Sequence, residues 1–372
     1  MKRRLLMSAL SLLGLFTSAC QDDLPKATLI EDMRILGSQI SVVGDETRAT
    51  PRPGESVRVS FATVFPEPEQ TVERAQLMLI SCTAPDRYTG GLPICQELID
   101  AVESGAAQEA ASLFTAPEQV KCSDIPGGRQ TFAGVTVLCL RGEPDVQLAI
   151  PDDFKGASAL FLGILCERGE AFLDPTTPEL FGCEDNDGAS IGLMGTYPVQ
   201  RNDDQINHNP DASLLSIEME PFIEWRPIDP EMLATLPESC ATATATSGAM
   251  PADPLFPGVD VGLHELTLRY PAKARERALN EPGEPFENLE ISVHATSGEV
   301  ERQFTVFTDD SETVGSKRGE VPIDTDPPWL EENVSWDPED DVPVTGQLVR
   351  FFVTVRDQRG GFNMSTYAAC VR

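Results

Sequence analysis

The alternation of apolar and polar residues predicts a chain built mainly of short β-strands. Ser56–Phe61 and Leu289–Ala295 alternate with period two, which is typical of strands with one buried face. Further apolar or alternating runs of strand length occupy residues 33–36, 75–82, 135–140, 159–166, 263–270, 301–307, 348–356 and 364–371. Many short strands separated by turn residues are typical of antiparallel β-sandwiches, so we expect a mainly β fold of that class.

One segment departs from the strand pattern. Gln96–Phe114 is rich in Ala and Glu, and Leu98, Ile99 and Val102 follow helical spacing. Gly105 is a point at which this segment can divide into two short helices. The sequence therefore predicts a short helical insertion between strands, at about residues 96–114.

A polar run containing a proline, residues 201–211, separates two blocks of predicted strands. A chain of 372 residues is long enough for two domains of ordinary size. We therefore expect two sandwich domains in tandem, at residues 28–204 and 205–372, the first carrying the helical insertion.

The N-terminus has the form of a bacterial lipoprotein signal peptide. Lys2-Arg3-Arg4 is followed by the apolar stretch Leu5–Phe16, which is too short to span a bilayer. Thr17-Ser18-Ala19 precedes Cys20 and resembles a lipobox, with Thr17 where Leu is usual. We expect residues 1–19 to be removed, Cys20 to carry the lipid anchor and residues 20–27 to form a tether. Cleavage after Ala19 by ordinary signal peptidase is the alternative.

The cysteine count agrees with lipidation of Cys20. Without it, eight cysteines remain, an even number in an exported chain. Eight cysteines allow about 105 pairings. Proximity favours pairing Cys82 with Cys95, Cys122 with Cys139 and Cys166 with Cys183, which leaves Cys240 to pair with Cys370. The rival for the first domain joins Cys82 to Cys166 across the sheets, as in antibody domains. A zinc site is not expected, because the chain has no CxxC motif and contains only three histidines.

The charge balance excludes one class of partner. The net charge is −32 at pH 7, and removing Lys2, Arg3 and Arg4 leaves 25 basic and 60 acidic residues. Such a surface repels phosphate backbones, so nucleic acid is not expected as a partner. It attracts divalent cations and basic partners, or it serves only to keep an exported protein soluble.

Several short motifs resemble a family of uncharacterised lipoproteins common in myxobacteria and related deltaproteobacteria. These motifs are Met33–Leu36, Pro53–Glu55 before a strand, a strand ending in Cys82, Asn207–Pro210 and Val355–Gly361. The chain departs from the family by lacking the Trp that often precedes the cysteine and by carrying the helical insertion. The resemblance implies Ig-like (PKD-like) sandwiches on a lipid tether and no particular reaction.

The expected lipid anchor implies one partner, the membrane. By resemblance to enterobacterial sorting, Gln21 after the lipidated cysteine favours the outer membrane over inner-membrane retention, which an Asp would favour. We expect a protein or glycan as the further partner, of a kind that the sequence does not identify.

Two strings resemble enzyme motifs without their required context. Gly188–Gly192 matches G-x-S-x-G around Ser190, but a polar run precedes it and no helical pattern follows. His264-Glu265 begins an H-E-x-x-H string that Leu268 ends. We therefore assign no catalytic residue and no metal ligand.

Calcium is the one candidate cofactor. Asp203, Asp204, Asn207, Asn209 and Asp211 place oxygen donors in the predicted linker, a pattern that loosely resembles cadherin linkers. The alternative is a solvated linker with Asx turns. A second acidic run at residues 184–188 is a weaker candidate.

The expected function is that of a non-enzymatic envelope lipoprotein, a lipid-anchored binding or structural module. The alternative is a calcium-dependent adhesion or receptor-type surface protein. An envelope hydrolase using Ser190 is less favoured.

Overall fold

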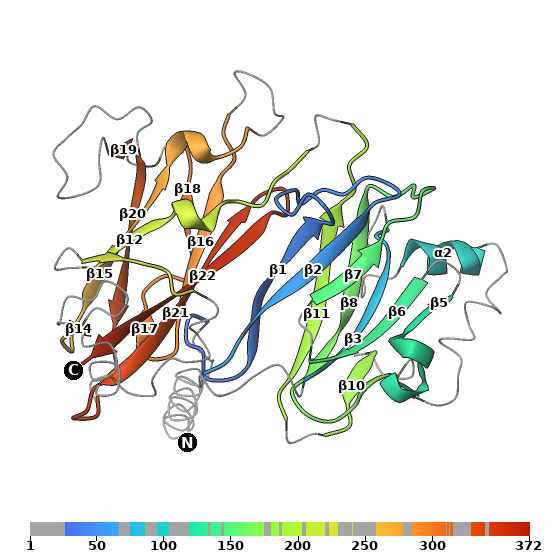
Figure 1. Cartoon of the computed structure of the whole chain (residues 1–372), viewed down its shortest axis with the longest axis horizontal. Coiled ribbons are helices and arrows are strands. Elements are labelled where there is room, and N and C mark those ends of the chain that lie inside the picture. The colour runs from blue at the N-terminus through green and yellow to red at the C-terminus, as the bar shows by residue number, and fades with distance from the viewer. Residues whose placement is uncertain are drawn as a thin grey trace, which may run out of the picture.

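The computed structural model describes most of the chain after residue 26. The described residues are 27–66, 75–85, 95–103, 119–132, 135–142, 145–174, 180–185, 188–202, 206–219, 223–229, 240, 258–277, 285–309, 311, 313–314, 329–338 and 342–372. The chain is mainly β and forms several sheets, which confirms the predicted fold class at this level (Figure 1). The predicted signal peptide, Cys20 and most of the tether lie outside the described residues.

The first sheet pair contains the strands between residues 34 and 198. Its three-stranded sheet runs in the order β1 (Arg34–Val42), β2 (Ser56–Val64), β7 (Asp145–Ala149). Its five-stranded sheet runs in the order β11 (Ser190–Pro198), β8 (Ser158–Cys166), β3 (Gln76–Thr83), β6 (Val135–Arg141), β5 (Arg129–Phe132). Both sheets are antiparallel throughout.

The central strands of the five-stranded sheet, β8, β3 and most of β6, are buried on both faces, which explains their continuous apolar runs. On one face, Leu79 and Phe161 pack against Val57 and Val59 of the three-stranded sheet. The opposite face carries a second apolar cluster that includes Met78. That face is covered by β4 (Val120–Lys121), β9 (Ala171–Leu173) and β10 (Phe181–Cys183), which form a small sheet, and by α2 (Gln96–Glu103).

The second sheet pair contains the strands between residues 216 and 371. One sheet runs β13 (Ile223–Trp225), β12 (Ser216–Met219), β15 (His264–Pro271), β20 (Trp329–Asp337), β17 (Glu299–Val300), with β19 (Thr313–Val314) also on β20. The other runs β14 (Gly258–Val259), β22 (Phe362–Val371), β21 (Gln347–Asp357), β16 (Leu289–Ala295), β18 (Thr305–Phe307). The pairing of β14 with β22 is parallel, and the other pairings of these two sheets are antiparallel.

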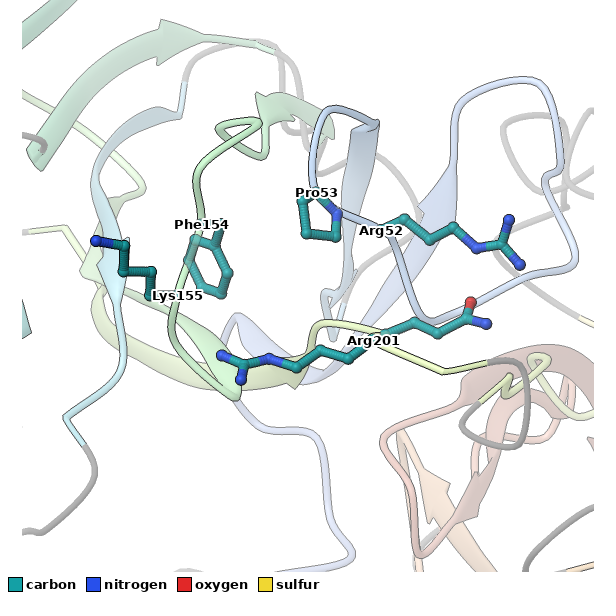
Figure 2. A pocket seen from close by; sticks show the side chains of 6 residues that line it. Arg52, Pro53, Phe154, Lys155 and Arg201 are labelled. Carbon is teal, nitrogen blue, oxygen red and sulfur yellow. The ribbon is translucent and has the colours of Figure 1, made fainter.

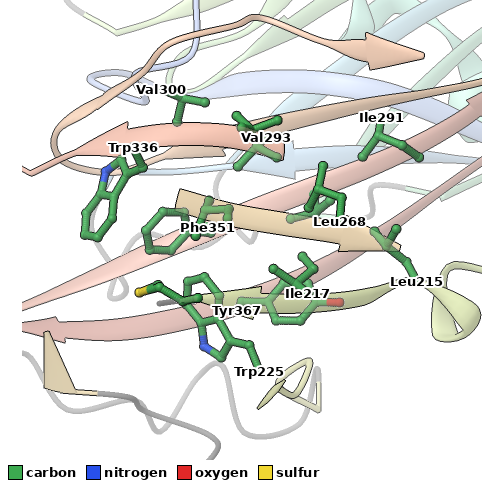
Figure 3. Packing of buried hydrophobic residues seen from close by; sticks show 14 of the residues in the cluster. Leu215, Ile217, Trp225, Leu268, Ile291, Val293, Val300, Trp336, Phe351 and Tyr367 are labelled. Carbon is green, nitrogen blue, oxygen red and sulfur yellow. The ribbon is translucent and has the colours of Figure 1, made fainter. Parts of the chain in front are cut away.

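Aromatic rings hold the second sheet pair together at its core (Figure 3). Phe351 lies 4.7 Å from Trp336 and 4.8 Å from Trp225 between ring centroids, so the contacts join both sheets. Both indole N–H groups find buried acceptors: Trp336 donates to the Ser297 carbonyl and Trp225 to the Ala368 carbonyl. Such edge-on ring pairs add to the burial energy of the rings themselves.

Four disulfides pair the eight cysteines that follow Cys20 in the sequence. They join Cys82 to Cys95, Cys122 to Cys139, Cys166 to Cys183 and Cys240 to Cys370. These are the pairs that proximity favours, and the rival bridge between Cys82 and Cys166 is not formed. The first three surround the small sheet and α2, while the fourth closes a separation of 130 residues in the second sheet pair.

The structure also differs from the sequence prediction in places. The strand predicted over residues 301–307 begins only at Thr305, because residues 301–304 are exposed and lie outside the strands, with Glu301 N donating to the Ser335 carbonyl at 2.9 Å. α2 covers the first part of the predicted helical segment, and the remainder, to residue 114, lies outside the described residues. Short 3-10 turns occur at Cys122–Asp124, Pro126–Gly128, Ala212–Leu214 and Ala272–Ala274. Within the described part of the chain, no helix has the length and apolar character needed to cross a bilayer.

Candidate functional site

The two sheet pairs meet along β1 and β22, where a small apolar cluster joins them (Figure 1). Ile30, Leu36 and Val64 from the first part of the chain pack with Phe352 of β21. The segment before β1 is bonded to the second sheet pair: Ile30 N donates to the Ala295 carbonyl (2.8 Å), and Ala295 N donates to the Thr28 carbonyl (2.9 Å). The first described residues therefore lie against β16 before the chain enters the first sheet pair.

A buried arginine crosses the same boundary. Arg350 of β21 is 9% exposed, and its Nη2 donates to the carbonyls of Phe65 (2.9 Å) and Pro66 (2.6 Å), at the end of β2. Burial lowers the pKa of Arg350 to about 10, which still leaves the guanidinium charged at neutral pH. The two carbonyls therefore receive charge-assisted hydrogen bonds in a site with little water.

The linker Asn207–Pro210 is bonded on both sides, and we call it and its partners the joint. Asn209 N donates to the Thr47 carbonyl (2.7 Å), and its Nδ2 donates to the Ile40 carbonyl (2.7 Å). Its Oδ1 accepts from Phe362 N of β22 at 3.1 Å. One side chain thus connects a strand of the first sheet pair with a strand of the second.

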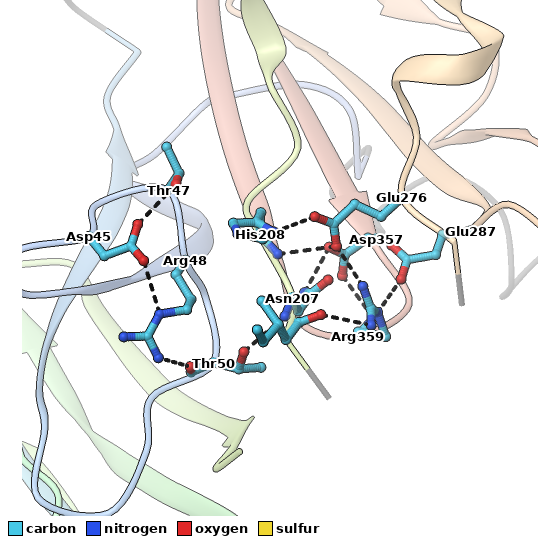
Figure 4. Close-up of polar contacts among 11 residues, drawn as sticks. Asp45, Thr47, Arg48, Thr50, Asn207, His208, Glu276, Glu287, Asp357 and Arg359 are labelled. Carbon is cyan, nitrogen blue, oxygen red and sulfur yellow. Dashed lines mark hydrogen bonds and ion pairs between the residues drawn. The ribbon is translucent and has the colours of Figure 1, made fainter. Parts of the chain in front are cut away.

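Asn207 repeats this arrangement nearer the core (Figure 4). It is 1% exposed, and its backbone N donates to Thr50 Oγ1 (2.9 Å) while its carbonyl accepts from Ala49 N (2.8 Å). Its Nδ2 donates to Asp357 Oδ2 at 3.0 Å. Asp357 opens the turn that the resemblance singled out, so two motifs 150 residues apart in sequence meet here.

Carboxylates on the other side of the linker surround one arginine (Figure 4). Arg359 donates to Glu276 (2.6 Å) and forms an ion pair with Glu287, whose side chain is 4% exposed. Glu276 also contacts the ring and backbone N of His208. Burial, helped by the negative charge of Asp357, raises the pKa of Glu287 to about 7. The guanidinium offsets the repulsion that these acids would otherwise create.

The loop between β1 and β2 is braced by an arginine of its own. Arg48 holds Glu55 through two hydrogen bonds (2.9 and 2.8 Å) and reaches Asp45 at 3.1 Å. Burial opposes ionisation of Glu55, but the Arg48 guanidinium, the Arg52 backbone N–H and the charges of both arginines together outweigh burial and lower the pKa of that carboxyl. The loop is therefore held in one shape, with Thr47, Ala49 and Thr50 presented to the linker.

The chemistry of the joint is structural. Glu276 and Glu287 are paired with Arg359, and the Asn207 amide N–H bonds to the Asp357 carboxylate. The Asn209 amide bonds to backbone groups of both sheet pairs. Buried polar groups that are satisfied only in one arrangement fix that arrangement, because separating them leaves donors and acceptors unpaired. The joint can therefore set the position of one sheet pair relative to the other.

The structure describes some of the residues on which the calcium hypothesis rests and not others. Asn207, Asn209 and Asp211 are described, whereas Asp203 and Asp204 lie outside the described residues. The Asn209 amide oxygen accepts from a backbone N–H, and Asp211 Oδ1 accepts from Ser213 N at 2.9 Å as a turn cap. Asn207 and Asn209 thus act in the joint, and Asp211 caps a turn.

The other candidate residues lie apart from one another. Ser190 is exposed at the start of β11, an edge strand, and not at the strand-to-helix turn of a nucleophile elbow. His264 stacks on Trp336, and His294 is buried in β16. Glu184 of the acidic run pairs with Lys121.

Among the described residues, the geometry of a metal-binding group occurs at Cys82, Cys95 and Glu97. The two sulfurs form a disulfide, and Glu97 accepts from the Thr83 backbone N at 3.0 and 3.1 Å. Thiolates bind metals and disulfides do so poorly, so this group is structural.

Sequence reasoning found the linker and the turn at Asp357, but it missed Glu276, Glu287, Arg350 and Arg359 as their partners. No periodic signal marks these residues, because each lies in an irregular segment or in a strand whose neighbours are apolar.

Comparison with known proteins identifies no family. No family model and no curated protein matches the chain. One solved structure, described as the Enterococcus faecalis MSCRAMM ACE, which binds its ligands by the collagen Hug Model, is similar at 9% identity over 94% of this chain and 97% of that chain. The TM-score is 0.16, and a likeness at that level carries no argument.

Proposed function

We propose that this chain is a non-enzymatic bacterial envelope lipoprotein whose two Ig-like domains, the first with a helical insertion at about residues 96–114, form one lipid-anchored binding or structural module. The membrane is its partner through Cys20, and a protein or glycan of the envelope is its partner through the folded surface. We place the anchor in the outer membrane, following Gln21.

The joint is the observation that carries the proposal. The two sheet pairs are held together by the side chains of Asn207, Asn209 and Arg350. Asn207 is 1% exposed and Arg350 is 9% exposed. A module that presents a surface gains from such a joint, because a preorganised surface loses less conformational freedom on binding.

The course of the chain after the anchor supports a position close to the membrane. Thr28 lies eight positions after Cys20, and an extended chain of that length spans at most about 28 Å. Thr28 and Ile30 are bonded to Ala295 at the boundary between the sheet pairs. The anchor would therefore hold the module at its middle, with both sheet pairs near the bilayer surface.

A binding screen tests the proposal against an enzymatic role. The mature chain, purified with its lipid, is applied to a glycan array and used as bait with envelope extracts, and it is assayed in parallel against ester and peptide substrates. We expect saturable binding and no turnover. Turnover that is lost in Ser190→Ala, with the fold retained, would overturn the proposal in favour of a hydrolase.

A further inference from the structure

A basic depression lies on the first sheet pair, beside the loop that supports the joint. It has a volume of about 420 Å³ and is lined by Arg52, Pro53, Phe154, Lys155, Gln200 and Arg201 (Figure 2). In this view the side chains of Pro53 and Lys155 flank the ring of Phe154. The depression is open to solvent, so a ligand reaches it without any opening of the fold.

Three separate segments are held in place around the depression. Gln200 N donates to the Pro51 carbonyl (2.7 Å), which joins the end of the first sheet pair to the loop carrying Arg52. Arg201 Nη2 donates to the Gly156 carbonyl at 2.8 Å, which fixes that guanidinium beside the segment of Phe154 and Lys155. The walls are therefore positioned by bonds of the fold.

The charge of the depression is opposite to that of the chain as a whole. Each ionisable residue that lines it is cationic, whereas the whole chain has 60 acidic and 28 basic residues. The nearby Glu55 is paired with Arg48 through both carboxylate oxygens and also accepts from the Arg52 backbone N–H at 2.7 Å, so it offsets part of the charge of Arg52. Asp152 and Asp153 precede Phe154 and are exposed outside the lining. The depression is a local positive site on an acidic surface, which favours an anionic ligand.

The remaining lining groups narrow the kind of anion. Phe154 and Pro53 offer apolar faces, against which the C–H face of a sugar ring can pack. Gln200 is 2% exposed, and its Oε1 is a buried acceptor that no hydrogen bond satisfies within the described part of the chain. Amide groups and guanidinium groups are suited to hydroxyls and carboxylates, respectively.

We infer that this depression binds an acidic oligosaccharide, a uronic-acid type of sugar chain whose carboxylates face Arg52, Lys155 and Arg201 and whose ring packs on Phe154. This inference rests on the proposed binding role and names the ligand class for it. An open depression of this volume takes one or two sugar units, so the affinity comes from a few contacts and from charge.

The test is a binding titration with a defined sugar and a matched neutral one. The full mature chain in detergent is titrated with a galacturonic acid tetrasaccharide and with its methyl ester, which removes the negative charge and keeps the rings. Variants are Lys155→Glu, Phe154→Leu and, as a surface control in the second sheet pair, Lys273→Glu. Lys155 and Lys273 are both exposed, so neither change perturbs the core.

We expect the acid form to bind and the ester to bind at least several-fold more weakly. Removing one exposed charge contact weakens binding by up to about fivefold, and Lys155→Glu, which reverses the charge, should weaken it further. Phe154→Leu should weaken both sugars, and Lys273→Glu should leave binding unchanged. Raising the salt from 50 to 500 mM should weaken the acid form, because screening acts on exposed charges.

Three results would overturn the inference. One is equal binding of acid and ester, another is binding that Lys155→Glu leaves intact, and the third is binding to neither sugar. Binding to anionic lipid vesicles that Lys155→Glu abolishes, with no sugar bound, would assign the depression to a membrane surface instead. A partner found by the array that binds Lys155→Glu normally would leave the proposed function standing and locate its surface elsewhere.

Discussion

Replacing Asn209 with alanine should loosen the contact between the sheet pairs. The change removes the donor to the Ile40 carbonyl (2.7 Å) and the acceptor for Phe362 N (3.1 Å). Ile40 and Phe362 are 2% and 5% exposed, so water does not readily replace the lost partners. A lost hydrogen bond costs about 0.5–1.5 kcal/mol net, and more where a buried group stays unpaired, which gives ~2–4 kcal/mol here.

The assay is urea unfolding followed by tryptophan fluorescence, with Asn333→Ala as the control. Asn333 is exposed on β20, so its loss should change the free energy of unfolding by less than about 0.5 kcal/mol. Asn209→Asp retains an acceptor for Phe362 N but places an oxygen against the Ile40 carbonyl, so it should also destabilise. An unfolding midpoint for Asn209→Ala equal to that of the control would refute the reasoning about the joint.

Three further predictions concern the body of the fold. Gly163→Ala should destabilise by more than ~2 kcal/mol, because a Cβ there collides with the neighbouring strand, whereas Gly192→Ala, with open space, should be neutral in the same urea assay. Burial lowers the pKa of His294 to about 4, so its contribution to stability is complete above about pH 6.5 and is lost as the pH falls toward 4, by up to ~3 kcal/mol; in His294→Phe the urea midpoint should fall less between pH 7 and 4.5 than it does in the unsubstituted chain. Replacing both Cys240 and Cys370 by alanine should cost about 4–5 kcal/mol by the loop-entropy estimate, more than removal of any other bridge, and equal midpoints for the four bridge deletions would contradict it.

Strands whose pattern is local could be predicted from the sequence. Ser56–Phe61 and Leu289–Ala295 alternate cleanly and lie in β2 and β16. In β2 the apolar face is the more buried one, whereas in β16 the polar face, with Ser292 and His294, is buried as well. β20 was missed, because Glu332 lies between Leu330 and Val334 on its buried face and so interrupts the apolar positions of WLEENVSWD. Glu331 lies on the opposite face of the strand, where it pairs with the buried Arg269 at 2.6 Å, a partner 62 residues away.

The two motifs that form the joint could each be predicted from the sequence, but the contact between them could not. Asn207–Pro210 and the turn after Asp357 were each visible as motifs, but nothing in a local pattern brings them together across 150 residues. The calcium hypothesis arose because oxygen donors in a linker look alike whether they bind an ion or backbone N–H groups. Asn209 shows the difference, since both of its amide atoms bond to the fold.

Mass spectrometry of the mature N-terminus tests the proposed function most directly. The account predicts that the chain isolated from membranes begins at Cys20 and carries a diacylglyceryl thioether with an acylated amine. An N-terminal peptide with an unmodified Cys20, or a chain that still contains residues 1–19, would contradict it and remove the membrane from the list of partners.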